Sequence, residues 1–296
     1  MRGVSIAISS SGRPEYLQRA VACALAQRGV DFEVVVVEQG GVPTPLPSEV
    51  RYYWLAEPHV GRARNLSWQV SRGELILFVD DDTEFRPSLA QAHWNRYLRE
   101  PQLGALAGLV IPRDWQCRDE VLAFWRRQFP GDHYHWMPTG NLSIPRRVLG
   151  ELGGFDPLLS HACEDSELTL RITLRGYRLK MCASSEMELL HHEALDGGCG
   201  FRTRLGGKRL QRVLWCKLYA YLKNREAFAL SRYLESTARE WRRFLRGLPL
   251  WKRPLQGLRF GLIYWSAFRA ARAVRKNYRP EGRVCGPAYA FGPPYR

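Results

Sequence analysis

The residues from Glu74 to Thr83, ELILFVDDDT, constrain the fold of this chain more than any other stretch. An unbroken apolar run without polar alternation predicts a strand that is buried on both faces, as in a parallel sheet. Asp80, Asp81 and Asp82 follow at once, where open α/β sheets bind their ligands. Adjacent carboxylates repel one another unless donors or a cation compensate them, and a hard divalent cation is the simplest compensator. A solvated acidic turn is the alternative interpretation.

Strands and helices alternate on both sides of this stretch. Apolar runs predict strands at 4–8, 32–37, 50–55, 104–111, 177–182 and 187–190, and an extended segment at 139–144. Helical spacing of apolar residues predicts helices at 13–29, 61–73, 87–99, 121–129, 146–152 and 164–175. Three alternations in the first eighty or so residues imply right-handed crossovers and a mostly parallel, Rossmann-like sheet flanked by helices.

The net charge of +15 is divided unevenly along the chain. Residues 1–201 carry 21 Lys and Arg against 25 Asp and Glu, whereas residues 202–296 carry 23 against 4. Beyond Gly206 the pattern predicts helices alone, at 210–221, 228–245 and 255–274. We therefore expect a catalytic domain at 1–205 and a basic helical extension at 206–296, one for the chemistry and the other for an anionic partner.

The cysteine pattern and the apolar runs bound the cellular location. The 7 cysteines form no CxxC pair and keep no regular spacing, which disfavours a zinc ribbon or a disulfide framework. Scattered cysteines in a chain of this length are typical of reduced, cytosolic proteins. The N-terminus lacks the apolar core of a signal peptide, and no apolar run approaches the ~20 residues of a membrane span. The sequence predicts a cytoplasmic protein.

Five segments in order resemble family 2 glycosyltransferases of the GT-A fold: VSIAISSSGRPEYLQRAV, EVVVVEQGG, GRARNLSWQVSRGELILFVDDD, TGNLSIPRRVLGELGGFD and EDSELTLRI. The resemblance covers roughly the first two hundred residues and implies transfer of a sugar from a nucleoside diphosphate sugar. It makes the aspartate triplet a DxD motif, in which Asp82 with Asp80 binds Mn²⁺ or Mg²⁺ and Asp80 and Asp81 contact the donor. Such a cation stabilises the charge that grows on the leaving diphosphate.

Glu164 and Asp165 resemble the ED motif of this family, whose carboxylate takes the proton from the acceptor hydroxyl. We expect Asp165 to be this base, since a helix N-terminus favours its ionised form, and Glu164 to orient it or to contact the acceptor. A plain helix cap is the alternative. The resemblance also implies a metal or diphosphate contact from His191. On a strand His192 would point the other way, and a surface histidine pair without function is the alternative.

The donor pocket is expected at the ends of the first two strands. By resemblance, Ser9, Ser10 and Arg13 belong to the loop that contacts the base and ribose. Glu38 stands where relatives usually carry Asp, and this departure leaves the donor identity open. Arg64 matches an arginine near the base and diphosphate, with an exposed helix charge as the alternative.

Residues near the middle of the chain are expected on the sugar side of the site. Gly140 and Asn141 match the segment that lies near the donor sugar in relatives. His133, His135 and Trp136 lie just upstream, where aromatic rings would stack on a sugar.

The basic extension combines arginine and lysine with aromatic residues, which suits a helix lying on an anionic membrane. Since many relatives use saccharide or lipid-linked acceptors, we expect peripheral contact with the inner face of the cell membrane. A packed helical extension with solvated arginines is the alternative.

Two other function classes remain open to the sequence. A nucleotidyltransferase that forms sugar nucleotides shares the metal-diphosphate logic, but SSSGRPE lacks the lysine of its usual glycine-rich loop. A non-enzymatic nucleic-acid-binding protein is compatible with the basic extension, but no RRM, KH or zinc-finger signature is present and the acidic first domain would repel phosphates. We therefore predict an inverting, metal-dependent glycosyltransferase of cell-surface polysaccharide or glycolipid synthesis. The sequence specifies neither donor, acceptor nor oligomeric state.

Overall fold

The computed structural model describes residues 3–112, 119, 123, 137–159, 162–192, 208–223 and 253–276. The chain forms two compact units, the first comprising most of residues 1–193 and the second most of residues 194–290. The expected boundary at 205/206 lies outside the described residues and stays a prediction. So do the expected helix at 228–245, nearly all of the helix at 121–129, and the stacking residues His133, His135 and Trp136.

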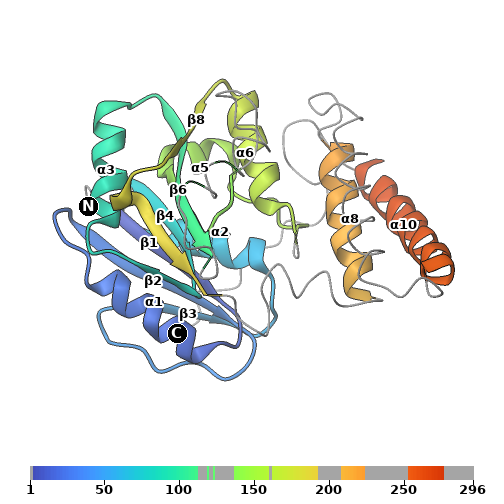
Figure 1. Ribbon diagram of the computed structural model, residues 1–296, viewed down its shortest axis with the longest axis horizontal. Coiled ribbons are helices and arrows are strands. Elements are labelled where there is room, and N and C mark those ends of the chain that lie inside the picture. Colours follow the sequence, from blue (N-terminus) through green and yellow to red (C-terminus); the bar gives the residue numbers. More distant parts are fainter. Residues whose placement is uncertain are drawn as a thin grey trace. The chain divides into compact units, whose positions relative to one another are not determined.

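The first unit is built on one sheet, with the strand order β3-β2-β1-β4-β7-β6-β9-β5 and β8 paired to β6 (Figure 1). The strands are β1 (Val4–Ser10), β2 (Phe32–Gln39), β3 (Arg51–Leu55), β4 (Leu75–Asp80), β5 (Thr83–Phe85), β6 (Leu103–Pro112), β7 (Asn141–Pro145), β8 (Arg178–Cys182) and β9 (Glu188–His191). β3, β2, β1 and β4 run parallel, β7 runs antiparallel between β4 and β6, and β6 is parallel to β8 and β9. The predicted mostly parallel α/β fold is confirmed, although the antiparallel place of β7 and the short β5 were not foreseen.

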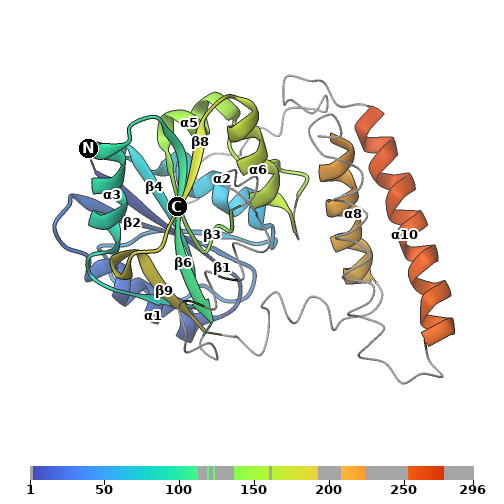
Figure 2. The ribbon, with the colours of Figure 1, turned by 45° about the horizontal axis from the view of Figure 1, so that its top comes forward.

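Helices cover both faces of this sheet, as Figures 1 and 2 show. α1 (Pro14–Leu25) and α3 (Leu89–Arg99) pack on one face, whereas α2 (Val60–Val70), α5 (Arg146–Leu152) and α6 (Glu164–Leu174) pack on the other. Side chains alternate between faces along a strand. In β4, Leu77 therefore faces α1 while Phe78 faces α5 and α6, which explains why the run before the aspartates is apolar without interruption.

The strand register gathers polar residues at one edge of the sheet. Ser9 in β1 lies opposite Asp80 in β4, and Ser10 lies opposite Glu38 in β2. Because β7 runs antiparallel to β4, its first residue, Asn141, lies opposite Val79 at the same edge. Segments far apart in the sequence thus meet where the parallel strands end, which is where α/β sheets bind ligands.

The second unit contains the described helices α8 (Lys208–Lys223) and α10 (Arg253–Lys276), which pack side by side. Tyr219 of α8 is buried and stacks on Trp215 at 5.1 Å between ring centroids, and Ala267 of α10 is buried. The helices expected at 210–221 and 255–274 are confirmed. Among the described helices, none has both the length and the apolar character that crossing a bilayer requires.

Candidate active site

Two carboxylates and an imidazole converge just beyond β4. β5 pairs with β9 so that Thr83 lies opposite His191, and the backbone N–H of His192 donates to the carbonyl of Asp82 at 2.7 Å. One ligand atom each from Asp80, Asp82 and His191 lies within 4.8 Å of the others. We call these three residues the metal cluster.

The two oxygens of Asp82 differ in their surroundings. Oδ2 accepts from Nη1 of Arg13 at 2.7 Å, while Oδ1 lies 3.4 Å from Nε2 of His191. Within the described residues Oδ1 is buried and has no hydrogen-bond partner, in a residue that is only 3% exposed. Burial, together with neighbouring Asp80, raises the pKa of Asp82. A buried carboxylate oxygen without a partner is costly, so this donor set fits a divalent cation.

Arg13 compensates much of the crowding in the aspartate triplet. It donates to both oxygens of Asp81, through Nε at 3.1 Å and through Nη2, and to Asp82. Ser10 adds a hydroxyl bond to Asp81 Oδ2 at 2.6 Å. Burial raises the pKa of Asp81 to about 7 even though Arg13 acts in the opposite direction. Ser10 and Arg13, expected to contact the nucleotide, therefore contact the aspartates in this structure, and a cation is not their sole compensator.

Arg64 connects the triplet to the ED motif. Its Nη1 donates to Oε1 of Glu164 at 2.5 Å, and its Nη2 lies 3.4 Å from Oδ1 of Asp80. Arg64 is 8% exposed, so the alternative of an exposed helix charge is wrong. Among the described residues the second oxygen of Glu164, Oε2, is buried without a hydrogen-bond partner. The expected contact of Arg64 with the nucleotide stays a prediction.

Asp165 lies in the first turn of α6 and is half-buried. Its Oδ1 accepts from the backbone N–H of Ser166 at 2.7 Å and from the Ser166 hydroxyl at 3.1 Å. Bonds to its own helix are compatible with a cap and with a base that is held in place. The role of Asp165 stays a prediction.

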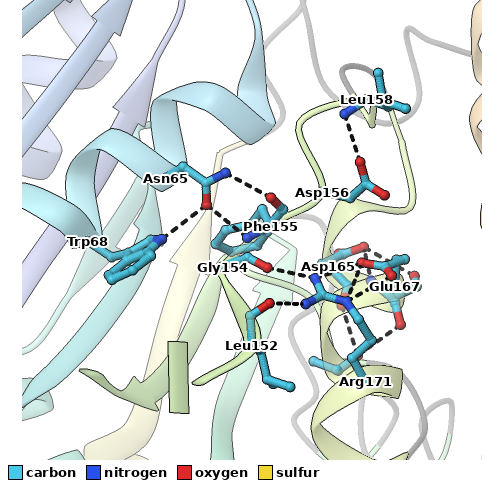
Figure 3. Close-up of polar contacts among 12 residues, drawn as sticks. Asn65, Trp68, Leu152, Gly154, Phe155, Asp156, Leu158, Asp165, Glu167 and Arg171 are labelled. Carbon is cyan, nitrogen blue, oxygen red and sulfur yellow. Dashed lines mark hydrogen bonds and ion pairs between the residues drawn. The ribbon is translucent and has the colours of Figure 1, made fainter. Parts of the chain in front are cut away.

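Side-chain hydrogen bonds from Asn65 and Arg171, which the sequence did not predict, fix the backbone at Gly154 and Phe155, before the ED motif (Figure 3). The side chain of Asn65 donates to the carbonyl of Phe155 and accepts from its N–H, both at 2.8 Å, and Trp68 fixes the Asn65 amide at 3.0 Å. From α6, Arg171 donates to the carbonyl of Gly154 at 2.6 Å. A Cβ on Gly154 would lie 2.4 Å from Asn65 Oδ1, which the glycine in GGFD avoids. The sequence signal for these bonds was Asn65, which directly follows Arg64 in the segment GRARN.

Both oxygens of Glu38 accept hydrogen bonds from neighbouring protein groups. Its carboxylate is buried and accepts from the Thr44 N–H at 2.8 Å, the Thr44 hydroxyl at 2.7 Å and the Tyr52 hydroxyl at 2.6 Å. Burial, aided by the bond to Glu38, raises the pKa of Tyr52. Glu38 is thus bonded within the protein, and its predicted contact with the nucleotide stays a prediction.

The segment that begins β7 divides between the site and the core. The side chain of Asn141 is buried: its Oδ1 lies 3.0 Å from Nε2 of His93, and its Nδ2 donates to the carbonyls of Leu109 and Met187. Gly140 lies against the metal cluster, since a Cβ there would approach Asp80 Oδ2 to 2.9 Å. Of this predicted pair, only Gly140 borders the cluster.

The two adjacent histidines point to different partners. Nε2 of His191 faces Asp82, whereas Nε2 of His192 lies 2.7 Å from Oε1 of Glu84. The alternation expected of a strand therefore places His191 in the cluster, and its role as a ligand stays a prediction. Ser9 lies beside Asp80 in the sheet register, so the predicted Ser9, Ser10, Arg13, Asp80, Asp81 and Asp82 share one edge.

Comparisons with known proteins agree with this geometry. Residues 5–115 match the model of glycosyl transferase family 2. An uncharacterized glycosyltransferase from Nostoc sp. is 31% identical over 178 residues, a match that spans 52% of this chain and 54% of that protein. A mannosyltransferase from Pyrobaculum calidifontis, solved in complex with GDP-Man and Mn²⁺, superposes with a TM-score of 0.56 at 18% identity and covers 92% of this chain and 87% of that one.

The structural likeness, at this low identity, bears on the fold alone, and it agrees with the sheet and helix arrangement described above. The family model covers β1 to β6 together with the aspartate triplet and Arg64. Residues 5–115 are therefore similar to glycosyl transferase family 2, within a fold that resembles that of the mannosyltransferase.

Proposed function

We propose that this protein transfers a sugar from a nucleoside diphosphate sugar to an acceptor hydroxyl in a metal-dependent reaction. The observation that carries the proposal is the metal cluster, whose buried Asp82 Oδ1 has no protein hydrogen-bond partner among the described residues. An acidic helix N-terminus, joined to this cluster through Arg64, supplies the second set of carboxylates that a hydroxyl attack needs.

Each residue has a defined part in the proposed reaction. Asp80, Asp82 and His191 hold the cation, and the nitrogen ligand among carboxylates favours Mn²⁺ over Mg²⁺. When bound, the cation supplies stabilisation of the charge that grows on the leaving diphosphate. Asp165 takes the proton from the acceptor hydroxyl, whose oxygen attacks the anomeric carbon on the side opposite its bond to the diphosphate. That bond breaks, the nucleoside diphosphate leaves, and the configuration of the anomeric carbon is inverted. Glu164 orients the acceptor.

A donor screen tests the proposal directly. Thermal stabilisation is measured with a panel of uridine, guanosine and thymidine diphosphate sugars, each with and without Mn²⁺. GDP-mannose with Mn²⁺ is the first pair to test, because the mannosyltransferase of similar fold was solved with both. We expect one donor to stabilise the protein only with Mn²⁺ and to be slowly hydrolysed to a nucleoside diphosphate. Release of pyrophosphate instead would identify a nucleotidyltransferase, and no response to any donor would contradict the proposal.

The Asp165→Asn variant tests the assigned base. General base catalysis contributes about 10²–10⁴-fold, so transfer should fall by that factor while Mn²⁺ and donor affinities stay unchanged. The assay compares sugar transfer with donor binding in the same preparation. Wild-type transfer by Asp165→Asn would remove Asp165 from the mechanism.

We also propose that α10 contacts an anionic membrane surface. Leu258, Leu262 and Trp265 are 65%, 65% and 60% exposed and share one helical face by their spacing. The exposed Arg269 and Arg272 continue the same face, which is the pattern of a helix lying in the headgroup region. Lipid-linked acceptors would be presented at such a surface.

Co-sedimentation with vesicles containing anionic lipid tests the membrane proposal. The wild-type protein should sediment at low salt and release at high salt, and Trp265→Ala should sediment several-fold less. Leu98→Ser, at an exposed leucine of α3 in the first unit, is the matched control and should sediment like the wild type. No sedimentation of the wild type at low salt would refute membrane contact.

A further inference from the structure

We propose that Arg64 is a positioning residue that divides its charge between Asp80 and Glu164, so that Glu164 sets the cation affinity of the metal cluster without being a ligand. The inference rests on the proposed metal-dependent function. It assigns to Arg64 a role toward the carboxylates of this chain, whereas the resemblance placed it at the nucleotide.

The contacts of Arg64 are unequal. The bond from Nη1 to Glu164 Oε1, at 2.5 Å, is short, whereas Nη2 lies 3.4 Å from Asp80 Oδ1. Both partners are carboxylates on separate elements, α6 and the end of β4, so one planar guanidinium fork spans the gap between them. The stronger contact holds the guanidinium toward Glu164 and leaves Asp80 available to a cation.

The surroundings keep Arg64 in this position. Its guanidinium carbon lies 5.8 Å from the ring centroid of Phe155, and the next residue, Asn65, binds the backbone of Phe155 on both sides. Arginine stays protonated in proteins, and the two carboxylates that face Arg64 pair with its charge. The cation of the cluster therefore always competes with a fixed positive charge for Asp80.

Two substitutions should move cation affinity in opposite directions. Arg64→Gln removes the competing charge beside Asp80, and Mn²⁺ should bind on the order of tenfold more tightly. Glu164→Gln releases Arg64 to pair fully with Asp80, and Mn²⁺ should bind several-fold more weakly although no cluster residue has changed. A residue that only maintained the fold would weaken binding in both variants.

The double variant Arg64→Gln/Glu164→Gln distinguishes an effect of Glu164 that acts through Arg64 from a direct electrostatic effect of Glu164 on the cation. If Glu164 acts through Arg64, the loss caused by Glu164→Gln shrinks once Arg64 is already Gln. Isothermal titration and electron paramagnetic resonance of free Mn²⁺ measure the four affinities without any turnover. The double variant also removes both buried charges together, so it folds even where Arg64→Gln alone, with Glu164 unpaired, does not.

Arg171 provides a matched control. It is a largely buried arginine that pairs with Glu167 at 2.8 Å and donates to the carbonyls of Leu152 and Gly154. Arg171→Gln should lower the melting temperature and leave Mn²⁺ affinity within twofold of the wild type.

The outcomes distinguish this inference from the function on which it rests. Absence of Mn²⁺ binding in the wild type would overturn both. Wild-type Mn²⁺ binding that Asp82→Ala abolishes, with equal losses from Glu164→Gln in the two Arg64 backgrounds, would overturn the inference alone. Opposite shifts in the single variants and a reduced loss in the double variant support it.

Discussion

Two buried carboxylates near the ends of the parallel strands β2 and β4, which flank β1, differ in how their oxygens are bonded. Glu38 is the penultimate residue of β2, and both of its oxygens accept from uncharged donors of Thr44 and Tyr52. Asp82 follows β4, is held on one side by Arg13, and within the described residues keeps its other oxygen unpartnered beside His191. Both follow an apolar run, so the local sequence marks them alike.

The difference teaches that position alone does not make an acid a ligand. Hydroxyl and amide donors from adjoining segments bond to both oxygens of Glu38, and we call such a carboxylate closed. A closed carboxylate stabilises the fold through its hydrogen bonds. The arginines that pair with Asp82 and Glu164 bond to one oxygen of each carboxylate, and the other oxygen is buried without a hydrogen-bond partner among the described residues. We call such carboxylates open, because the second oxygen is available to a bound ligand. We expect substitutions at the closed and open carboxylates to separate stability from binding.

The largest separation should come from Asp82→Ala. Loss of an outer partner of a metal ligand costs about 10–100-fold in metal affinity, so loss of the ligand itself should exceed about a hundredfold. Stability should hold or rise, because a buried carboxylate beside two others is removed. Titration of Mn²⁺ and urea unfolding measure the two effects. Unchanged Mn²⁺ affinity in Asp82→Ala would show that the cluster is not the metal site.

The converse is expected of Glu38→Ala. Its three donors lose their acceptor, and such bonds contribute about 1.5–3 kcal/mol each, so unfolding free energy should fall by more than about 4 kcal/mol. Mn²⁺ affinity should stay within twofold. Glu57→Ala, at an exposed position, is the control and should change stability by less than about 0.5 kcal/mol. If Glu38→Ala kept wild-type stability but lost donor binding, Glu38 would be a nucleotide contact and not a structural residue.

The fold was largely predictable because it depends on short-range patterns. The alternation of apolar strands with helices fixed β1 to β4 and their parallel order, and the unbroken run in β4 predicted burial on both faces. The three-residue β5 carries too few residues for a pattern. The antiparallel place of β7 depends on pairing with β4 and β6 across long loops, which no local pattern records.

The acidic residues of the site were predictable from the sequence, but the arginines that pair with them were not. Alternation along a strand was enough to prefer His191 over His192 for the cluster. The bonds from Arg13 to the aspartates join residues nearly seventy positions apart, and the bond from Arg64 to Glu164 spans a hundred. Such pairings follow from the assembled sheet, so the sequence suggested a cation as compensator where the fold supplies two arginines first.

A smaller effect is expected at a second closed network, around His93. Its ring is buried between Ser143 and Asn141, and burial lowers the pKa of His93 to about 4, against the bond to Asn141. The unfolded chain takes up this proton near pH 6.5, so stability is complete above pH 6.5 and falls as the pH drops toward 4. The loss amounts to about 3 kcal/mol at most.

The variant His93→Gln isolates this contribution. Unfolding free energies at pH 7, 5.5 and 4 should fall less steeply in His93→Gln than in the wild type, even though the variant is less stable at pH 7. Mn²⁺ affinity at pH 7 should not change, because His93 contacts the core side of β7 and no member of the metal cluster. Identical slopes for the two proteins would mean that folding leaves the pKa of His93 unchanged.

The smallest effect is expected beside the open carboxylates, at Cys163. Its φ of 66° places it in the left-handed region, immediately before Glu164, and a residue other than glycine is strained there by about 1–2 kcal/mol. Cys163→Gly relieves this strain but makes the unfolded chain more flexible, so a net gain of up to about 1 kcal/mol should appear in urea unfolding. Cys163→Ser keeps the Cβ and should show no such gain. Equal stabilities of the Gly and Ser variants would show that the backbone conformation of residue 163 costs no free energy. Backbone strain beside Glu164 would then not be one of the differences between this carboxylate and that of Glu38.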